Sequence, residues 1–157
     1  MRASGILMPV FSLPSRYGIG SFSKSAYQFV DMLKKAGQKY WQILPLCPTS
    51  YGDSPYQSFS TYAGNPYFID LDQLIEEKLL TRKECQACDF GDDPQDIDYG
   101  KLYENRFKLL RKAYERANVG EDQEFEAYRR ENAWWLDDYA LFMAVKDRFD
   151  GVAWNEW

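Results

Sequence analysis

Histidine is absent from this sequence of 157 residues, and cysteine is scarce, with three residues. Without histidine the chain cannot build a Ser-His-Asp triad or a Cys-His pair. Zinc sites commonly draw four ligands from cysteine and histidine, so the lone pair Cys85-x-x-Cys88 predicts no metal site. An odd number of cysteines also argues against a disulfide framework.

Long apolar runs and clusters of basic residues are missing too. The longest apolar run, residues 5–10, is too short to span a bilayer, and the first residues lack the apolar segment of a signal peptide. The sequence therefore predicts no membrane partner and a cytoplasmic location.

The net charge is −5, and the basic residues alternate with acidic ones, whereas nucleic-acid binding needs a basic patch. No nucleic-acid partner is expected; a neutral partner such as a sugar is compatible with this charge.

Nucleotide-binding signatures are not found either. No G-x-x-x-x-G-K-[ST] segment occurs, which excludes a P-loop, and Gly18-Ile19-Gly20 is too short for a dinucleotide fingerprint. Aromatic residues, by contrast, make up 17% of the chain. This enrichment is typical of a surface that stacks on flat ligands, and equally of a core built from bulky side chains.

The first 46 residues have the pattern of a strand–helix–strand unit. Two short apolar runs, at residues 5–13 and 40–46, predict strands, and Pro9 indicates an edge position or a bulge in the first. Ser23 can cap the helix between them, and Gly37 suits its C-terminal end. The apolar residues of this helix share one face: Ala26, Phe29, Val30 and Leu33. A βαβ unit of this size implies two parallel strands.

The remainder of the chain is predicted to be mainly helical. Asp70 can cap the first helix, and residues 89–98 are expected to form an acidic, solvated linker. The helical segments are expected at residues 71–80, 81–88, 102–118, 123–130 and 136–149. We therefore predict two parts, an α/β part at residues 1–69 and an inserted helical subdomain at residues 70–157.

A long loop, residues 47–66, lies between the second strand and the helical part. Loops of this length are usually functional or disordered, and the aromatic residues of this loop argue against disorder. It follows the C-terminal end of a strand, where α/β barrels place their sites. Residues 51–58 offer aromatic faces for a sugar ring and polar groups for its hydroxyls. A polar surface loop with tyrosines packed on the barrel rim would have the same composition.

The sequence shows no catalytic pair of carboxylates. Glycosyl transfer with retention needs two carboxylates about 5–5.5 Å apart. Asp53 is the only acidic residue in the loop, and the other acids lie on predicted helix faces or in the linker, where solvation is their default role. No residue of this chain is therefore assigned a catalytic role.

Six short segments together resemble the amylomaltase, or disproportionating-enzyme, family of 4-α-glucanotransferases. They are RASGIL at 2–7, SLPS at 12–15, YGIG at 17–20, WQILPL at 41–46, DSPYQS at 53–58 and GNP at 64–66. Each segment is weak alone, but their order and spacing are specific. The resemblance covers the whole chain and is best over residues 2–80.

This resemblance implies the first βαβ unit of a (β/α)₈ TIM barrel and a helical insertion, with the barrel incomplete in this chain. It implies transfer of α-1,4-glucan segments between maltooligosaccharides or starch through a covalent glycosyl-enzyme, without a cofactor. It places Ser54 and Tyr56 near the donor and acceptor sugars, with Asp53 in the same substrate-binding segment. It also places Tyr51 and Tyr99 at a second glucan-binding groove.

The carboxylates that perform catalysis in this family come from later barrel strands, and no residue here matches their motifs. The chain is therefore expected to be an N-terminal portion of such an enzyme and to be inactive alone. Two alternatives remain open from the sequence: an autonomous glucan-binding module, and a structural fragment with no function of its own.

Overall fold

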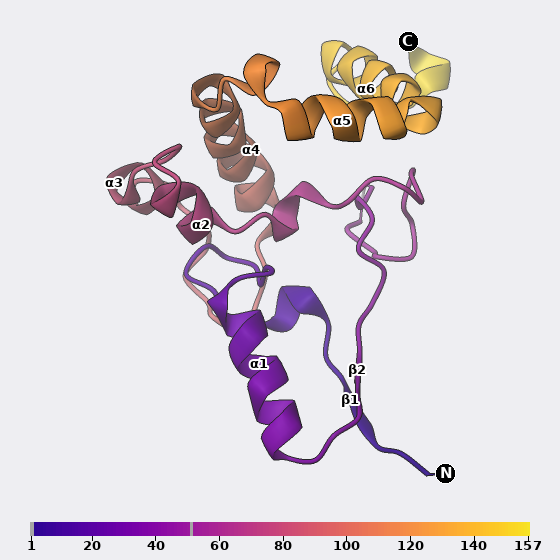
Figure 1. Ribbon diagram of the computed structural model, residues 1–157. Helices are drawn as coiled ribbons and strands as arrows, with labels where there is room; N and C mark the ends of the chain where they lie inside the picture. The colour runs from indigo at the N-terminus through magenta and orange to yellow at the C-terminus, as the bar shows by residue number, and fades with distance from the viewer. Residues whose placement is uncertain (1, 51) are drawn as a thin grey trace.

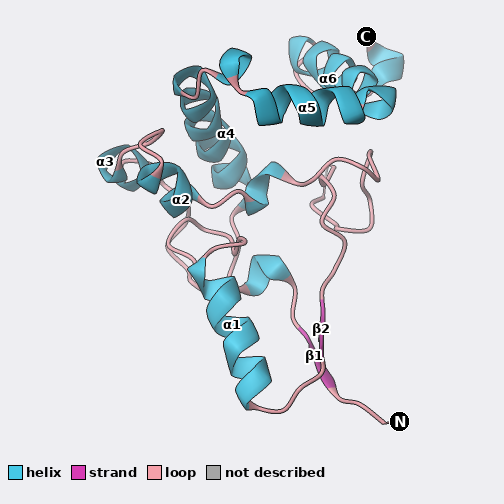
Figure 2. Ribbon diagram, viewed as in Figure 1, coloured by secondary structure: helices cyan, strands magenta, loops and turns pink. Residues whose placement is uncertain are grey.

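The computed structural model describes residues 2–50 and 52–157 and contains two short strands and a set of helices (Figures 1 and 2). The strands are β1 (Gly5–Leu7) and β2 (Tyr40–Gln42). The α-helices are α1 (Lys24–Lys35), α2 (Leu71–Glu76), α3 (Arg82–Gln86), α4 (Tyr99–Arg116), α5 (Gln123–Glu131) and α6 (Ala133–Arg148). Single 3₁₀ turns are η1 (Val10–Ser12), η2 (Pro66–Phe68), η3 (Val119–Glu121) and η4 (Trp154–Glu156). The two termini lie at opposite ends of the molecule (Figure 1).

The predicted parallel pair of strands is confirmed, but both strands are shorter than predicted. Gly5 pairs with Tyr40 and Leu7 with Gln42 in a parallel register. The first strand ends where Pro9 removes a backbone donor and becomes the N-cap of η1. The prediction of a strand through residue 13 was therefore wrong, because Pro9 turns the chain instead of forming a bulge.

Helix α1 joins the two strands and begins and ends as predicted. The Ser23 hydroxyl accepts a hydrogen bond from the backbone N–H of Ser25 at 3.3 Å. Gly37 has a φ of 71°, the left-handed conformation in which glycine is favoured after a helix. The Trp41 ring packs edge to face on Phe29 of α1, with centroids 5.0 Å apart, and its Nε1 donates to the Met8 carbonyl at 2.7 Å. These contacts fix α1 against β2.

The hydrophobic core lies between the segment after β1 and helices α2, α3 and α4. Its fully buried side chains include Val10, Leu71, Leu80, Cys85 and Leu102. The predicted parts 1–69 and 70–157 both contribute to it. Gly20 allows the closest approach within this core, because a Cβ there would meet the Val10 carbonyl oxygen at 2.1 Å.

The helix boundaries follow local capping signals. Asp70 accepts from the N–H of Asp72 and begins α2, as predicted, but α2 ends at Glu76 because Lys78 adopts a left-handed φ of 63°. Asp98 accepts from the N–H of Lys101 and starts α4 at Tyr99, three residues before the predicted start. Among residues 2–50 and 52–157, no helix is both long and apolar enough to cross a membrane.

Candidate functional site

The candidate site is the loop at residues 47–66, whose base is closed by one residue pair. The backbone N–H of Asn65 donates to the Leu46 carbonyl at 2.8 Å, so the loop leaves and returns at the same place beyond β2. The buried Asn65 side chain also accepts from the N–H of Tyr67 at 2.9 Å and begins η2. A loop of twenty residues is thus anchored on the ordered part of the chain.

The outer part of this loop, residues 49–50 and 52–58, is cross-linked by hydrogen bonds, and we call it the loop tip. Thr49 and Ser58 form an antiparallel bridge, and the Ser50 hydroxyl donates to the Gln57 carbonyl at 2.8 Å. The N–H of Asp53 donates to the Ser50 carbonyl at 3.0 Å. The tip turns at Asp53, whose φ is 55°, a left-handed conformation that short polar side chains tolerate.

The predicted residues of the tip differ in their exposure. Tyr56 is 72% exposed, so most of its side chain is open to solvent. Ser54 is half-buried, and its hydroxyl accepts from the N–H of Tyr56 at 3.4 Å. Asp53 is also half-buried; burial raises the pKa of its carboxyl, and a hydrogen bond from the Thr49 side chain partly opposes that shift. Tyr51, the fourth predicted residue of this segment, lies outside the described residues.

Tyr99 feels the charge of Asp53 in the tip although the two residues are 46 positions apart in the sequence. It is the first residue of α4, and its ring centroid is 6.2 Å from that of Tyr67 in η2. Burial raises the pKa of both phenols, that of Tyr67 to about 12, and the negative charge of Asp53 adds to both shifts. The charge of Asp53 therefore acts on two tyrosines from different elements, η2 and α4.

Sequence reasoning missed the aromatic contacts between the loop and α6. Phe59 stacks on Tyr139 with centroids 6.4 Å apart, and Tyr62 meets Trp134 edge to face at 4.7 Å. The only hint in the sequence is that Trp135, Tyr139 and Phe142 are spaced for one helical face. Nothing in the sequence indicates that this face meets the loop.

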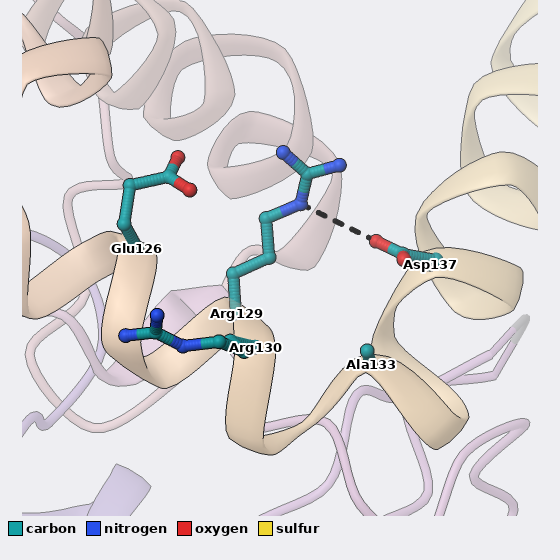
Figure 3. Close-up of a pocket in the computed structure, with 5 residues that line it drawn as sticks. All are labelled: Glu126, Arg129, Arg130, Ala133 and Asp137. Atoms are coloured by element: carbon teal, nitrogen blue, oxygen red, sulfur yellow. Dashed lines mark hydrogen bonds and ion pairs between the residues drawn. The ribbon is translucent and has the colours of Figure 1, made fainter.

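A separate surface hollow of about 290 Å³ lies between α5 and α6 (Figure 3). Its lining consists of Glu126, Arg129, Arg130, Ala133 and Asp137. The lining holds two arginines and two acids, and Arg129 Nε pairs with Asp137 Oδ1 at 3.4 Å. Exposed ion pairs of this kind contribute little to stability, and the positive and negative charges of the lining balance. We therefore place the candidate site at the loop and not in this hollow. In the described part of the chain, no group of three or more Cys, Asp or Glu side chains is arranged to hold a metal ion.

Comparison with known proteins decides the family. The sequence profile of the family described as 4-alpha-glucanotransferase matches residues 8–157. The chain belongs to this family. The resemblance carried by the six short segments is therefore confirmed.

Individual relatives of this 4-alpha-glucanotransferase family match nearly the whole chain. The 4-alpha-glucanotransferase of Clostridium butyricum is 55% identical over 150 residues, which is 96% of this chain and 31% of that protein. The Thermus thermophilus enzyme of the same description is 47% identical over 160 residues, 99% of this chain and 31% of that protein. The chain thus spans about a third of the length of the curated relatives it matches.

A solved structure agrees with these sequence relatives. The structure of an amylomaltase from Streptococcus agalactiae in complex with acarbose superposes with a TM-score of 0.92 at 45% identity. The match covers 100% of this chain and 32% of that one. The mixture of helices with a small parallel sheet is therefore the arrangement found in the corresponding part of an amylomaltase.

Proposed function

We propose that this chain forms the first part of a 4-α-glucanotransferase that transfers α-1,4-glucan segments between maltooligosaccharides or starch with retention. The match to the family across residues 8–157 carries this proposal. In its finer form, β1, α1 and β2 are the first βαβ unit of a (β/α)₈ barrel, and residues 70–157 are a helical insertion. A cytoplasmic location and the absence of a nucleic-acid partner stay predictions from the sequence.

Within this activity, the loop at residues 47–66 has the role of binding glucan. The exposed ring of Tyr56 supports this role, because a phenol that is mostly open to solvent is available to cover the apolar face of a glucose ring. The Ser54 hydroxyl accepts from the N–H of Tyr56, and a hydroxyl that accepts in this way can also donate its proton to a sugar oxygen. A few placed polar groups beside an apolar surface are the usual make-up of a ligand site.

Asp53 and Tyr99 complete the proposed set, together with Tyr51. Asp53 is assigned to binding and not to catalysis, since a retaining mechanism needs two carboxylates about 5–5.5 Å apart and the loop holds only this one acid. Its carboxylate can accept hydrogen bonds from sugar hydroxyls. Tyr99, the first residue of α4, is within reach of the charge of Asp53 and is assigned to a second glucan-binding groove.

A chimera tests this proposal. Residues 1–157 replace the corresponding third of the Clostridium butyricum enzyme, and the chimera is incubated with maltotriose. We expect disproportionation to glucose and longer maltooligosaccharides from the chimera, and none from the 157-residue chain alone. A folded chimera that leaves maltotriose unchanged, while the parent enzyme converts it, would show that this chain does not serve the transfer reaction.

A further inference from the structure

The loop tip has strong internal bonds, and its two sides meet different parts of the molecule. On one side the charge of Asp53 acts on Tyr67 and Tyr99, whose ring centroids lie 6.2 Å apart. On the other side the chain leaves the tip at Ser58, whose hydroxyl donates to the Ser60 carbonyl at 2.7 Å. The position of the tip therefore depends on what holds residues 59–62.

Helix α6 holds these residues through aromatic contacts. Phe59 packs on Tyr139 and Phe142, with centroids 6.4 and 6.5 Å away. Tyr62 packs on Trp134 at 4.7 Å and on Trp135 at 5.8 Å. Figure 1 shows the loop after β2 rising toward α5 and α6, as these pairs require.

The helix side of these contacts is itself fixed. Trp135 Nε1 donates to Asn132 Oδ1 at 3.0 Å, and the Asn132 amide donates to the Tyr128 carbonyl in α5 at 2.8 Å. The Trp135 ring also lies 6.0 Å from Tyr139 on the same helical face. The aromatic face of α6 is thus held by contacts that do not involve the loop.

We propose that α6 positions the substrate loop, with Phe59 and Tyr62 as positioning residues for glucan binding. Their ring contacts with Tyr139 and Trp134 hold the tip that carries Ser54 and Tyr56. This inference rests on the proposed function of the loop. It gives the helical insertion a task in the reaction beyond covering the rest of the fold.

These contacts lie at the surface, and this makes the inference testable. Tyr62 is 60% exposed, so its removal leaves no large internal cavity. Aromatic pairs contribute roughly 0.5–1.5 kcal/mol beyond burial, which corresponds to a change of about two- to tenfold in an equilibrium between held and released tip. Loss of Tyr62 should therefore loosen the tip without unfolding the chain.

The test compares hydrogen exchange of the tip amides in the full chain and in variants. We expect the amides of Asp53 and Gln57 to exchange roughly two- to tenfold faster in Tyr62→Ala, with α1 and α4 unchanged. Tyr62→Phe, which keeps the ring, should show the same exchange rates as the wild-type chain. Tyr114→Ala is the matched control, because Tyr114 on α4 is 62% exposed. Tyr139→Leu probes the same contact from the helix side.

Affinity for maltoheptaose, measured by titration calorimetry on the same proteins, distinguishes a failure of this inference from a failure of the proposed function. Faster tip exchange together with a matching loss of affinity in Tyr62→Ala and Tyr139→Leu supports the inference. Unchanged tip exchange in both variants overturns it, and so does faster exchange with unaltered affinity. A wild-type chain that does not bind maltoheptaose would instead count against the proposed function of the loop, whatever the exchange rates.

Discussion

Arg116 on α4 and Glu84 on α3 are joined by two parallel hydrogen bonds, Nη1 to Oε2 at 2.9 Å and Nη2 to Oε1 at 2.8 Å. Lys112 Nζ adds a third contact to Glu84 at 3.0 Å, and Thr81 shares the same carboxylate in a capping box. These bonds lower the pKa of Glu84 well below its ordinary value, with Arg116 the largest cause. One carboxylate thus links α3 to α4.

This carboxylate makes stability depend on pH in the acid range. Because the folded pKa of Glu84 is depressed, its contribution is present above the unfolded pKa of about 4.3 and is lost as pH falls through the folded value. We expect Glu84→Gln to lower the melting temperature at pH 7 and the difference from wild type to shrink by pH 2–3, roughly the range below that unfolded pKa. Glu76→Gln, on the exposed side of α2, is the control and should change little. A difference that does not vary with pH would contradict this prediction.

Arg106 gives a second prediction, because it is a charged side chain inside the core. Its Nη2 donates to the Ile69 carbonyl, but within the described residues its Nε and Nη1 have no hydrogen-bond partner. Burial lowers its pKa to about 10, so it stays charged at neutral pH at a cost. We expect Arg106→Ala to lower the free energy of unfolding by about 2–5 kcal/mol through the cavity it leaves.

The variant Arg106→Met separates the effect of lost side-chain volume on stability from the effect of lost charge. Methionine fills most of the space and removes the two unpaired donors, so we expect a loss of less than about 1.5 kcal/mol. Arg111→Met, at an exposed position of α4, is the control and should change stability by about 0.5 kcal/mol or less. Urea denaturation measures all three variants, and a methionine variant as unstable as the alanine variant would show that the charge itself is needed.

The exposed sheet predicts that the isolated chain self-associates. Both residues that follow Gly5 in β1 are exposed and apolar, and Leu7 is 56% exposed. Exposed strand edges and apolar faces favour pairing between chains. We expect the apparent mass in light scattering to rise with concentration, and Leu7→Lys to reduce that rise. Met32→Lys on α1, with 58% exposure at the original residue, serves as the control; a monomer at every concentration would refute the prediction.

Local signals in the sequence predicted much of this fold. The caps at Ser23 and Asp70 and the glycine at Gly37 act as expected because each satisfies or ends a helix through neighbouring backbone groups. The boundaries that were wrong also have local causes. Pro9 ends the first strand by removing a donor, and Asp98 starts α4 ahead of Gly100, a poor helix former that hid the first turn.

The candidate site depends more on tertiary contacts, which a single sequence does not reveal. The loop itself was predicted from its length and composition, and Tyr56 from the family resemblance. The meeting of Tyr67 and Tyr99 arises from the packing of α4 on η2, and the charge of Asp53 acts on both phenols. The contact of Tyr62 with Trp134 spans 72 residues and carries no local signature.

The central claim is that the exposed ring of Tyr56 binds glucan, and one variant of the chimera tests it most directly. Misplacing a substrate by about 1 Å can cost about 10²-fold in rate, so we expect Tyr56→Ala to lower kcat/KM for maltotriose by about 10- to 100-fold. The melting temperature should change by only about 2 °C, because the ring is 72% exposed. Tyr27→Ala, at a position 74% exposed on α1, should leave kcat/KM unchanged. Near-normal kcat/KM in Tyr56→Ala, together with a large fall in melting temperature, would show that Tyr56 is a packing residue and would contradict the claim.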